Sequence, residues 1–305
     1  MAAENVQQTY ENLVASLRAE GAVCAITSGL ACVYYGIAES TKDCDLLCHP
    51  QGFETLLRLI DSFQVEGTAA AYRGNVSPPL DVRWHAGGWT SHFEWPLKPD
   101  PLLLDVFGQP LRQFSPWESD LSGLYAGAHT VAAMKRTARD KDWPFVTSLG
   151  LRMIDAGDER GWLHLFHAET IIALQQDESC PEAIAAQRPA LQLARKNDPR
   201  LSGALNAERK FWEELDRRRI HIMEQALRPY VSAVRARRSP TKLNLQEDHD
   251  LRLQCALEHL PTSPVRDHGA ERLIEESRRS LVESGIIPQA GLDWLPDVRR
   301  YLTIA

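Results

Sequence analysis

The sequence has little cysteine, no long apolar run and no excess of positive charge. Six cysteines among 305 residues are too few and too irregularly spaced for a disulfide framework, so we expect buried, reduced thiols. The longest apolar run, at about 29–38, is far shorter than the ~20 residues that cross a bilayer. A formal net charge of −7 gives no global attraction to nucleic acid or to an anionic membrane. We therefore expect a cytoplasmic protein without membrane contacts.

Internal repeats and low-complexity tracts are also lacking, which excludes a solenoid. The first 20 residues carry three glutamates and no cationic segment ahead of an apolar stretch, so we expect no secretory signal. What is present is a globular composition, with 44% hydrophobic and 25% charged residues. This composition predicts a folded chain of one large or two ordinary domains.

Hydrophobic periodicity divides the chain into two parts. Helices are predicted near 5–19, from 29 and over 50–62, and strands near 22–27, 43–48, 79–85 and 102–107. From about residue 121 the spacing is helical, with Pro229 among the prolines expected to separate helices and 239–250 expected to form an exposed linker. We predict an α+β fold, in which a mixed β-sheet domain flanked by helices (1–120) precedes an all-helical domain (121–305). The boundary is expected between 115 and 160.

Two aspartates alternate on one predicted strand. Asp43 and Asp45 project from one face, whereas Cys44, Leu46 and Cys48 project from the other. Two like charges side by side cost free energy unless a cation neutralises them. Carboxylate oxygens suit Mg²⁺, which takes one or two protein carboxylates and completes its shell with water and substrate phosphate. The pair therefore predicts a magnesium site.

A turn upstream of this strand offers a seat for phosphate. Ser28-Gly29 stands where a predicted strand becomes a helix, and glycine there lets backbone N–H groups approach an anion. A third acid is expected on a neighbouring strand, where Asp81 and Asp105 both qualify and Asp81 is favoured. A phosphate turn followed by a paired-aspartate strand is the layout that metal-assisted nucleotidyl transfer requires.

These motifs resemble the nucleotidyltransferase superfamily, which has the DNA polymerase β-like fold, and within it the AbiEii-type and minimal nucleotidyltransferases. The Ser28-Gly29 turn, the Thr-x-Asp-x-Asp strand at 41–45 and the Lys-x-x-x-Arg-x-Lys-Asp helix at 135–142 carry the resemblance. It covers roughly residues 20–150. Two positions depart from the family pattern, because Ser28 replaces the usual glycine and Glu39 stands where the family often has arginine.

The resemblance implies a role for each motif. Asp43 and Asp45 would hold two Mg²⁺ ions, and Asp81 would complete the metal set and help to deprotonate an acceptor hydroxyl. The implied nucleotide- and phosphate-binding residues are Ser28, Gly29, Thr41, Lys135 and Arg139. The implied reaction moves a nucleoside monophosphate from a nucleoside triphosphate to a hydroxyl of an RNA, a protein or a small molecule.

Other interpretations stay open. Ser28 and Glu39 favour a catalytically inactive binding or regulatory protein, such as a toxin–antitoxin component with a partner protein. A helical scaffold with an incidental sheet would bind neither metal nor nucleotide. Residues 208–242, with ten Lys and Arg against five acids, fit an RNA backbone or an ordinary solvated helix face. The aromatic segment 87–95 is interpreted as a base-stacking loop or as a hydrophobic plug onto the helical domain.

Overall fold

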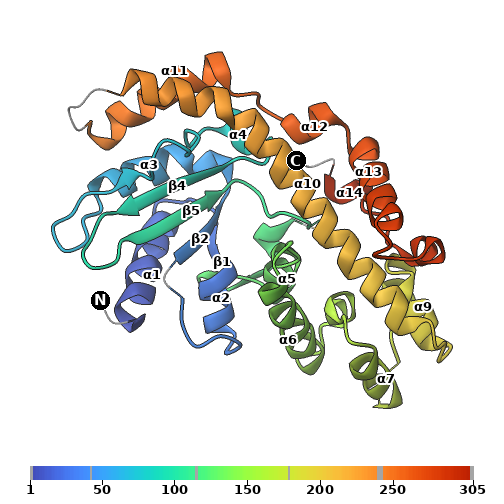
Figure 1. The fold of residues 1–305 in the computed structure, drawn as a ribbon. Coiled ribbons are helices and arrows are strands. Elements are labelled where there is room, and N and C mark those ends of the chain that lie inside the picture. The colour runs from blue at the N-terminus through green and yellow to red at the C-terminus, as the bar shows by residue number, and fades with distance from the viewer. Residues whose placement is uncertain (1–2, 42, 114–115, 178, 239–242, 303–305) are drawn as a thin grey trace.

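A computed structural model describes residues 3–41, 43–113, 116–177, 179–238 and 243–302 of the chain (Figure 1). Two predicted features fall partly outside these ranges. Lys42, within the aspartate motif, and residues 239–242, within the expected linker and the basic stretch, are not among the described residues.

The strands of the described residues form one mixed sheet in the order β3-β4-β5-β2-β1-β7-β6. They are β1 Cys24–Thr27, β2 Asp43–Cys48, β3 Ala71–Tyr72, β4 Thr90–Trp95, β5 Leu102–Phe107, β6 Leu121–Ser122 and β7 Tyr125–Ala126. Strand β2 runs parallel to β5 and antiparallel to β1, so the aspartate strand lies inside the sheet. The predicted α+β class with a mixed sheet is confirmed.

Helices pack around the sheet and dominate the second half of the chain (Figure 1). The α-helices are α1 Ala3–Ala19, α2 Ser28–Tyr34, α3 Phe53–Ser62, α4 Val82–His85, α5 Ala128–Met134, α6 Trp143–Asp155, α7 Ala168–Asp177, α8 Glu182–Gln187, α9 Ala190–Arg195, α10 Leu201–Arg237, α11 Leu245–His259, α12 Pro264–His268, α13 Ala270–Glu283 and α14 Arg299–Leu302. The 3₁₀ segments are η1 Pro50–Gly52, η2 Trp117–Ser119, η3 Asp140–Asp142, η4 Glu159–His164 and η5 Gln289–Trp294.

Three predicted elements differ from the structure. The strand predicted at 79–85 is the short helix α4, because the Asp81 side chain accepts a hydrogen bond from the Arg83 amide and caps a helical turn. The aromatic segment 87–95 contains the strand β4 rather than a loop, whereas its Trp89 packs with Tyr230 and Leu260 of the helical half, as the plug interpretation predicted. Helices were predicted from residue 121, but the chain there first forms the strands β6 and β7, which are the last two strands at one edge of the sheet.

The long helix α10 contributes to two hydrophobic clusters. Its buried residues Phe211 and Trp212 pack with α13 and the C-terminal residues, whereas Tyr230 and Val234 pack with α11 and with Trp84 of α4. The prediction that Pro229 ends a helix is wrong. Pro229 is exposed, so the missing N–H bond leaves the opposing carbonyl open to water, and buried residues anchor α10 on both sides.

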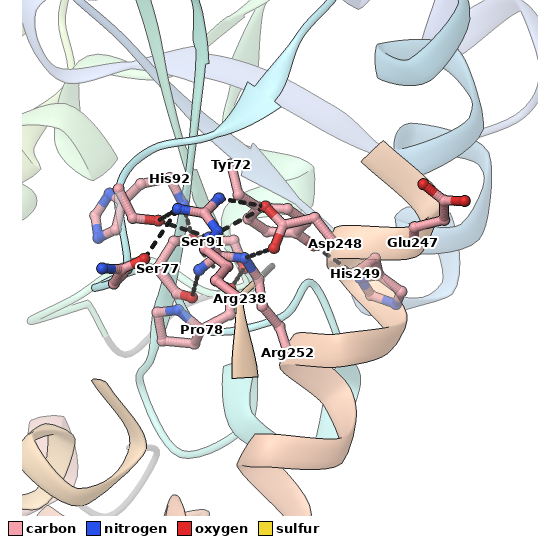
Figure 2. Close-up of polar contacts among 12 residues, drawn as sticks. Tyr72, Ser77, Pro78, Ser91, His92, Arg238, Glu247, Asp248, His249 and Arg252 are labelled. Carbon is pink, nitrogen blue, oxygen red and sulfur yellow. Dashed lines mark hydrogen bonds and ion pairs between the residues drawn. The ribbon is translucent and has the colours of Figure 1, made fainter. Parts of the chain in front are cut away.

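Helix α11 docks on the sheet through buried charges (Figure 2). Asp248 accepts hydrogen bonds from Arg238 and Arg252, and Arg252 also donates to the Ser77 carbonyl at 2.7 Å. The Tyr72 hydroxyl lies 2.7 Å from Nδ1 of His249. The linker prediction is therefore wrong over 245–250, where the chain is a helix with a buried aspartate.

No helix of the described residues is long and apolar enough to cross a membrane. All six cysteines are buried free thiols. Burial raises the pKa of Cys24 and of Cys32 to about 11, so both stay protonated near neutral pH.

Candidate active site

A row of polar side chains crosses four strands of the sheet. The parallel register of β2 and β5 places Asp45 beside Asp105, and the antiparallel registers place Thr27 of β1 and His92 of β4 at the two ends of the row. Residues directly opposite each other on neighbouring strands share a face of the sheet. Asp43 lies two residues before Asp45 and shares that face. The sheet thus gathers three carboxylates on one surface.

This surface is one wall of a cleft of about 700 Å³, a volume within the range of small-molecule sites. Asp43, Asp45 and Asp105 line it from the sheet. The cationic residues that line it come from later segments and are Arg112, Lys135, Arg139, Lys141 and Arg219. The same later segments also bring Asp142 and Asp216 into the lining, where they pair with several of these cations. This side of the cleft therefore keeps an excess of positive charge and faces the acidic strand side, a combination that suits a metal–phosphate ligand.

The folded protein disfavours the ionised form of Asp45. Burial raises its pKa to about 6, and the negative charges of Asp105 and Asp43 act in the same direction. A hydrogen bond from Ser28 and the charge of Lys135 oppose the rise but do not cancel it. A bound cation would therefore stabilise the ionised form of Asp45.

Asp105 is instead neutralised by protein groups. Its Oδ1 accepts from Nδ1 of His92 at 2.7 Å and from Nη2 of Arg73 at 2.8 Å. Burial alone would raise the pKa of Asp105, but the hydrogen bonds and charges of these two partners outweigh burial and lower it. The His92 backbone N–H donates to Oγ of Ser77, in the same cluster that α11 binds (Figure 2). Asp105 is thus held in a fixed position.

The turn after β1 is tight, and its backbone conformation at Ser28 is strained. Ser28 adopts φ of 56°, a left-handed conformation that costs non-glycine residues about 1–2 kcal/mol. A Cβ on Gly29 would lie 2.8 Å from Oγ1 of Thr41, so only glycine lets these two segments meet. Ser28, Gly29 and Thr41 all line the cleft. The serine that departs from the family pattern is therefore accommodated and donates to Asp45.

The predicted helix over 135–142 is not present. Helix α5 ends at Met134, and Lys135 and Arg139 lie in the connection to α6. Asp142 explains the break, because its carboxylate accepts from Nζ of Lys135 at 3.3 Å, from Thr137 and from Arg139. Such side-chain bonds compete with helix formation. Lys135 and Arg139 still line the cleft, Lys135 as a buried cation and Arg139 with its side chain 58% exposed.

Two predicted positions lie elsewhere. Asp81 is not among the described residues that line the cleft, and its carboxylate forms an ion pair with Arg83 at 2.9 Å. Glu39 is exposed and is likewise outside that lining, so the position that departs from the family pattern adds no carboxylate to the cleft.

Helix α10 adds cleft residues that the sequence did not reveal. Arg219 lines the cleft; its Nη2 lies 3.3 Å from Oδ1 of Asp216, and its Nε has no acceptor among the described residues. Buried Asp216 accepts from Nη1 of Arg112 at 2.7 Å and from the Ala138 amide at 2.9 Å, which ties α10 to the cleft. The only sequence signal was the basic stretch, in which nothing distinguishes position 219 from its neighbours. Several arginines of that stretch pair with carboxylates, among them Arg209, Arg217, Arg218, Arg237 and Arg238.

The donor set fits a hard cation only in part. Within the described ranges, no three His, Cys, Asp or Glu residues gather closely enough to form a complete protein metal site. Asp43 and Asp45 alone match what Mg²⁺ usually takes from a protein when substrate phosphates complete its shell. Asp43 is exposed and Asp45 half-buried, so both are open to the cleft.

Comparisons of the chain with protein-family models, with curated proteins and with solved structures found no match.

Proposed function

We propose that this chain is a Mg²⁺-dependent nucleotidyltransferase with the DNA polymerase β-like fold. The observation that supports it best is the cleft in which paired aspartates on β2 face lysine and arginine side chains from 135–141 and α10. A triphosphate carries negative charge that the cationic side can bind, while the aspartates stay available for metal. Ser28, Gly29 and Thr41 border the same space and supply a tight turn for a phosphate.

Asp43 and Asp45 would hold Mg²⁺, which when bound neutralises charge developing on the transferred phosphoryl group. In this proposal the third carboxylate is Asp105 rather than Asp81, because Asp105 lies beside Asp45 in the same cleft. Lys135 and Arg219 bind phosphate oxygens. The acceptor oxygen bonds to the α-phosphorus, the bond to the β-phosphate oxygen breaks, and pyrophosphate leaves. The acceptor proton is taken up at the aspartate row.

One observation favours a second candidate, a catalytically inactive nucleotide-binding protein that acts on a partner. Asp105 is already compensated by Arg73 and His92, and its lowered pKa makes it a weak base. A chain of this kind would bind Mg²⁺ and triphosphate in the cleft without turning the nucleotide over.

Incubation of the purified chain with each α-labelled nucleoside triphosphate and Mg²⁺ separates the two candidates. Total RNA, mixed cellular protein, a small-molecule cell extract and the chain itself serve as acceptors. The transferase predicts label transfer that Asp43→Asn and Asp45→Asn abolish. Asp81→Asn is the matched control, because it removes a carboxylate outside the cleft and leaves transfer intact. Triphosphate binding without transfer to any acceptor supports the inactive protein, and absence of both contradicts both candidates.

A further inference from the structure

A second cavity lies in the helical half, separate from the aspartate row. Its volume is about 170 Å³, several times the space that a single water needs and below that of drug-sized ligand sites. Residues from α5, η4, α8 and α10 surround it. Arg112 borders both this cavity and the cleft, so the two are adjacent. We call it the arginine pocket, after Arg112, Arg136, Arg160 and Arg188 in its lining.

Buried donors without acceptors gather at this pocket. Nε of Arg136, Nη2 of Arg188 and Nε1 of Trp212 have no hydrogen-bond partner among the described residues. The three side chains line the pocket and are only 6%, 2% and 2% exposed. Leaving a buried donor unpaired costs about 1–3 kcal/mol, and more when it is charged. Three such donors around one cavity indicate a missing acceptor.

One guanidinium of the pocket forms no ion pair among the described residues, although it feels the charge of Glu208, which is paired with Arg188. Arg112, Arg160 and Arg188 each form an ion pair, with Asp216, with Asp120 and Asp158, and with Glu208. Arg136 has no carboxylate partner among the described residues, and it donates to the Leu163 carbonyl at 2.8 Å and to Nδ1 of His164 at 3.1 Å. Burial lowers the pKa of Arg136 to about 10, which leaves it protonated at neutral pH. A buried charge without an ion-pair partner costs free energy, so a bound anion would stabilise Arg136.

Two histidines of the pocket are linked to Arg136 by hydrogen bonds. Because Arg136 donates to Nδ1 of His164, His164 carries its proton on Nε2 and donates to Nδ1 of His129 at 2.9 Å. The proton of His129 is then on its Nε2. Burial, together with nearby arginine charge, lowers the pKa of His129 to about 4 and holds that of His164 well below its usual value, so both are neutral. Neither histidine supplies the negative charge that Arg136 lacks.

We propose that the arginine pocket binds one phosphate-sized oxyanion, either inorganic phosphate or the phosphate of a larger molecule. Guanidinium groups bind phosphate in charge-assisted, often bidentate geometry, and the indole N–H of Trp212 adds a donor. Aromatic rings brace the guanidinium groups, since Arg188 lies 4.2 Å and Arg136 5.8 Å from the ring centre of Phe166. The cavity volume admits such an ion and excludes a whole nucleotide from the pocket.

Calorimetric titration of the full chain with inorganic phosphate, at ionic strength held constant with chloride, tests the site. Wild type is expected to bind one phosphate saturably, and Arg136→Met to bind it at least tenfold more weakly. Arg195→Gln is the control, because Arg195 is an exposed arginine of α9 outside the pocket lining. Asp45→Asn should keep phosphate binding, which makes the result independent of the proposed transferase.

Trp212→Phe keeps an aromatic ring and removes one donor. It tests phosphate binding if Arg136→Met fails to fold, and it is expected to bind phosphate several-fold more weakly than wild type. A phosphomonoester titrated in parallel identifies the source. Tighter binding of inorganic phosphate indicates the free ion, and tighter binding of the monoester indicates a phosphate group of a larger molecule. The inference is overturned if neither ligand binds, or if Arg136→Met and Trp212→Phe bind phosphate as tightly as wild type.

Discussion

Substitution of Asp45 by asparagine is expected to stabilise the metal-free protein, and only at the higher pH values. Burial, together with the charges of Asp105 and Asp43, raises the pKa of Asp45 from 3.8 to about 6. The folded state therefore holds this proton more tightly than the unfolded chain does. Ionisation of the carboxyl costs folding stability as the pH rises from 3.8 to about 6, and the full cost is present above that range.

The magnitude follows from the same two values. Each pKa unit is worth about 1.4 kcal/mol, so the difference between 3.8 and about 6 corresponds to ~3 kcal/mol. Asparagine keeps the size and the acceptor oxygen for Ser28 but carries no charge. Asp45→Asn should thus match wild type below pH 3.8 and exceed it by ~3 kcal/mol at pH 8.

Urea unfolding of both proteins from pH 3.5 to pH 8, in the presence of a chelator, measures this difference. Added Mg²⁺ should stabilise wild type and leave the variant unchanged, because a ligand that binds only the folded state adds to its stability. A stability difference that does not change with pH would refute the electrostatic account of Asp45. A Mg²⁺ effect of equal size in both proteins would refute its role in metal binding.

Three further substitutions probe the cleft. Ser28→Gly should exceed Ser28→Ala by ~1 kcal/mol in urea unfolding, because both lose the hydroxyl and only glycine relieves the left-handed backbone; equal stabilities would contradict that conformation. Asp216→Asn should cost about 3–5 kcal/mol at pH 7 by leaving Arg112 unpaired. The pKa of Asp216 is lowered, since the charges of its arginine partners outweigh burial, so this cost should shrink at pH 3 or below; a cost unchanged there would argue against the ion pair. Arg219→Gln should weaken Mg²⁺–triphosphate binding about tenfold in calorimetry, whereas exposed Arg217→Gln should not; equal losses would exclude a specific contact.

Local patterns predicted the part of the site that depends on local structure. The alternation of Asp43 to Cys48 predicted both the strand β2 and the face of its aspartates, since strand periodicity follows directly from sequence. The turn at Ser28-Gly29 was found for the same reason, because a strand and a helix meet there.

Contacts between segments that are distant in sequence could not be predicted from local patterns. The choice between Asp81 and Asp105 depended on which segment pairs with β2, and that pairing is set by the whole sheet. Asp81 looked equivalent in a short apolar run, but the two prolines before it and its cap on α4 make it the start of a helix. Arg219 reaches the cleft because α10, which is distant in sequence from β2, borders it, and no spacing within the basic stretch encodes that contact.

A crystal of the chain soaked with Mn²⁺ and a non-hydrolysable nucleoside triphosphate tests the central claim most directly. Anomalous scattering should place manganese against the carboxylates of Asp43 and Asp45, with the triphosphate between that metal and Lys135 or Arg219. A fully occupied triphosphate bound elsewhere, or a cleft that holds no manganese at saturating concentration, would contradict the account.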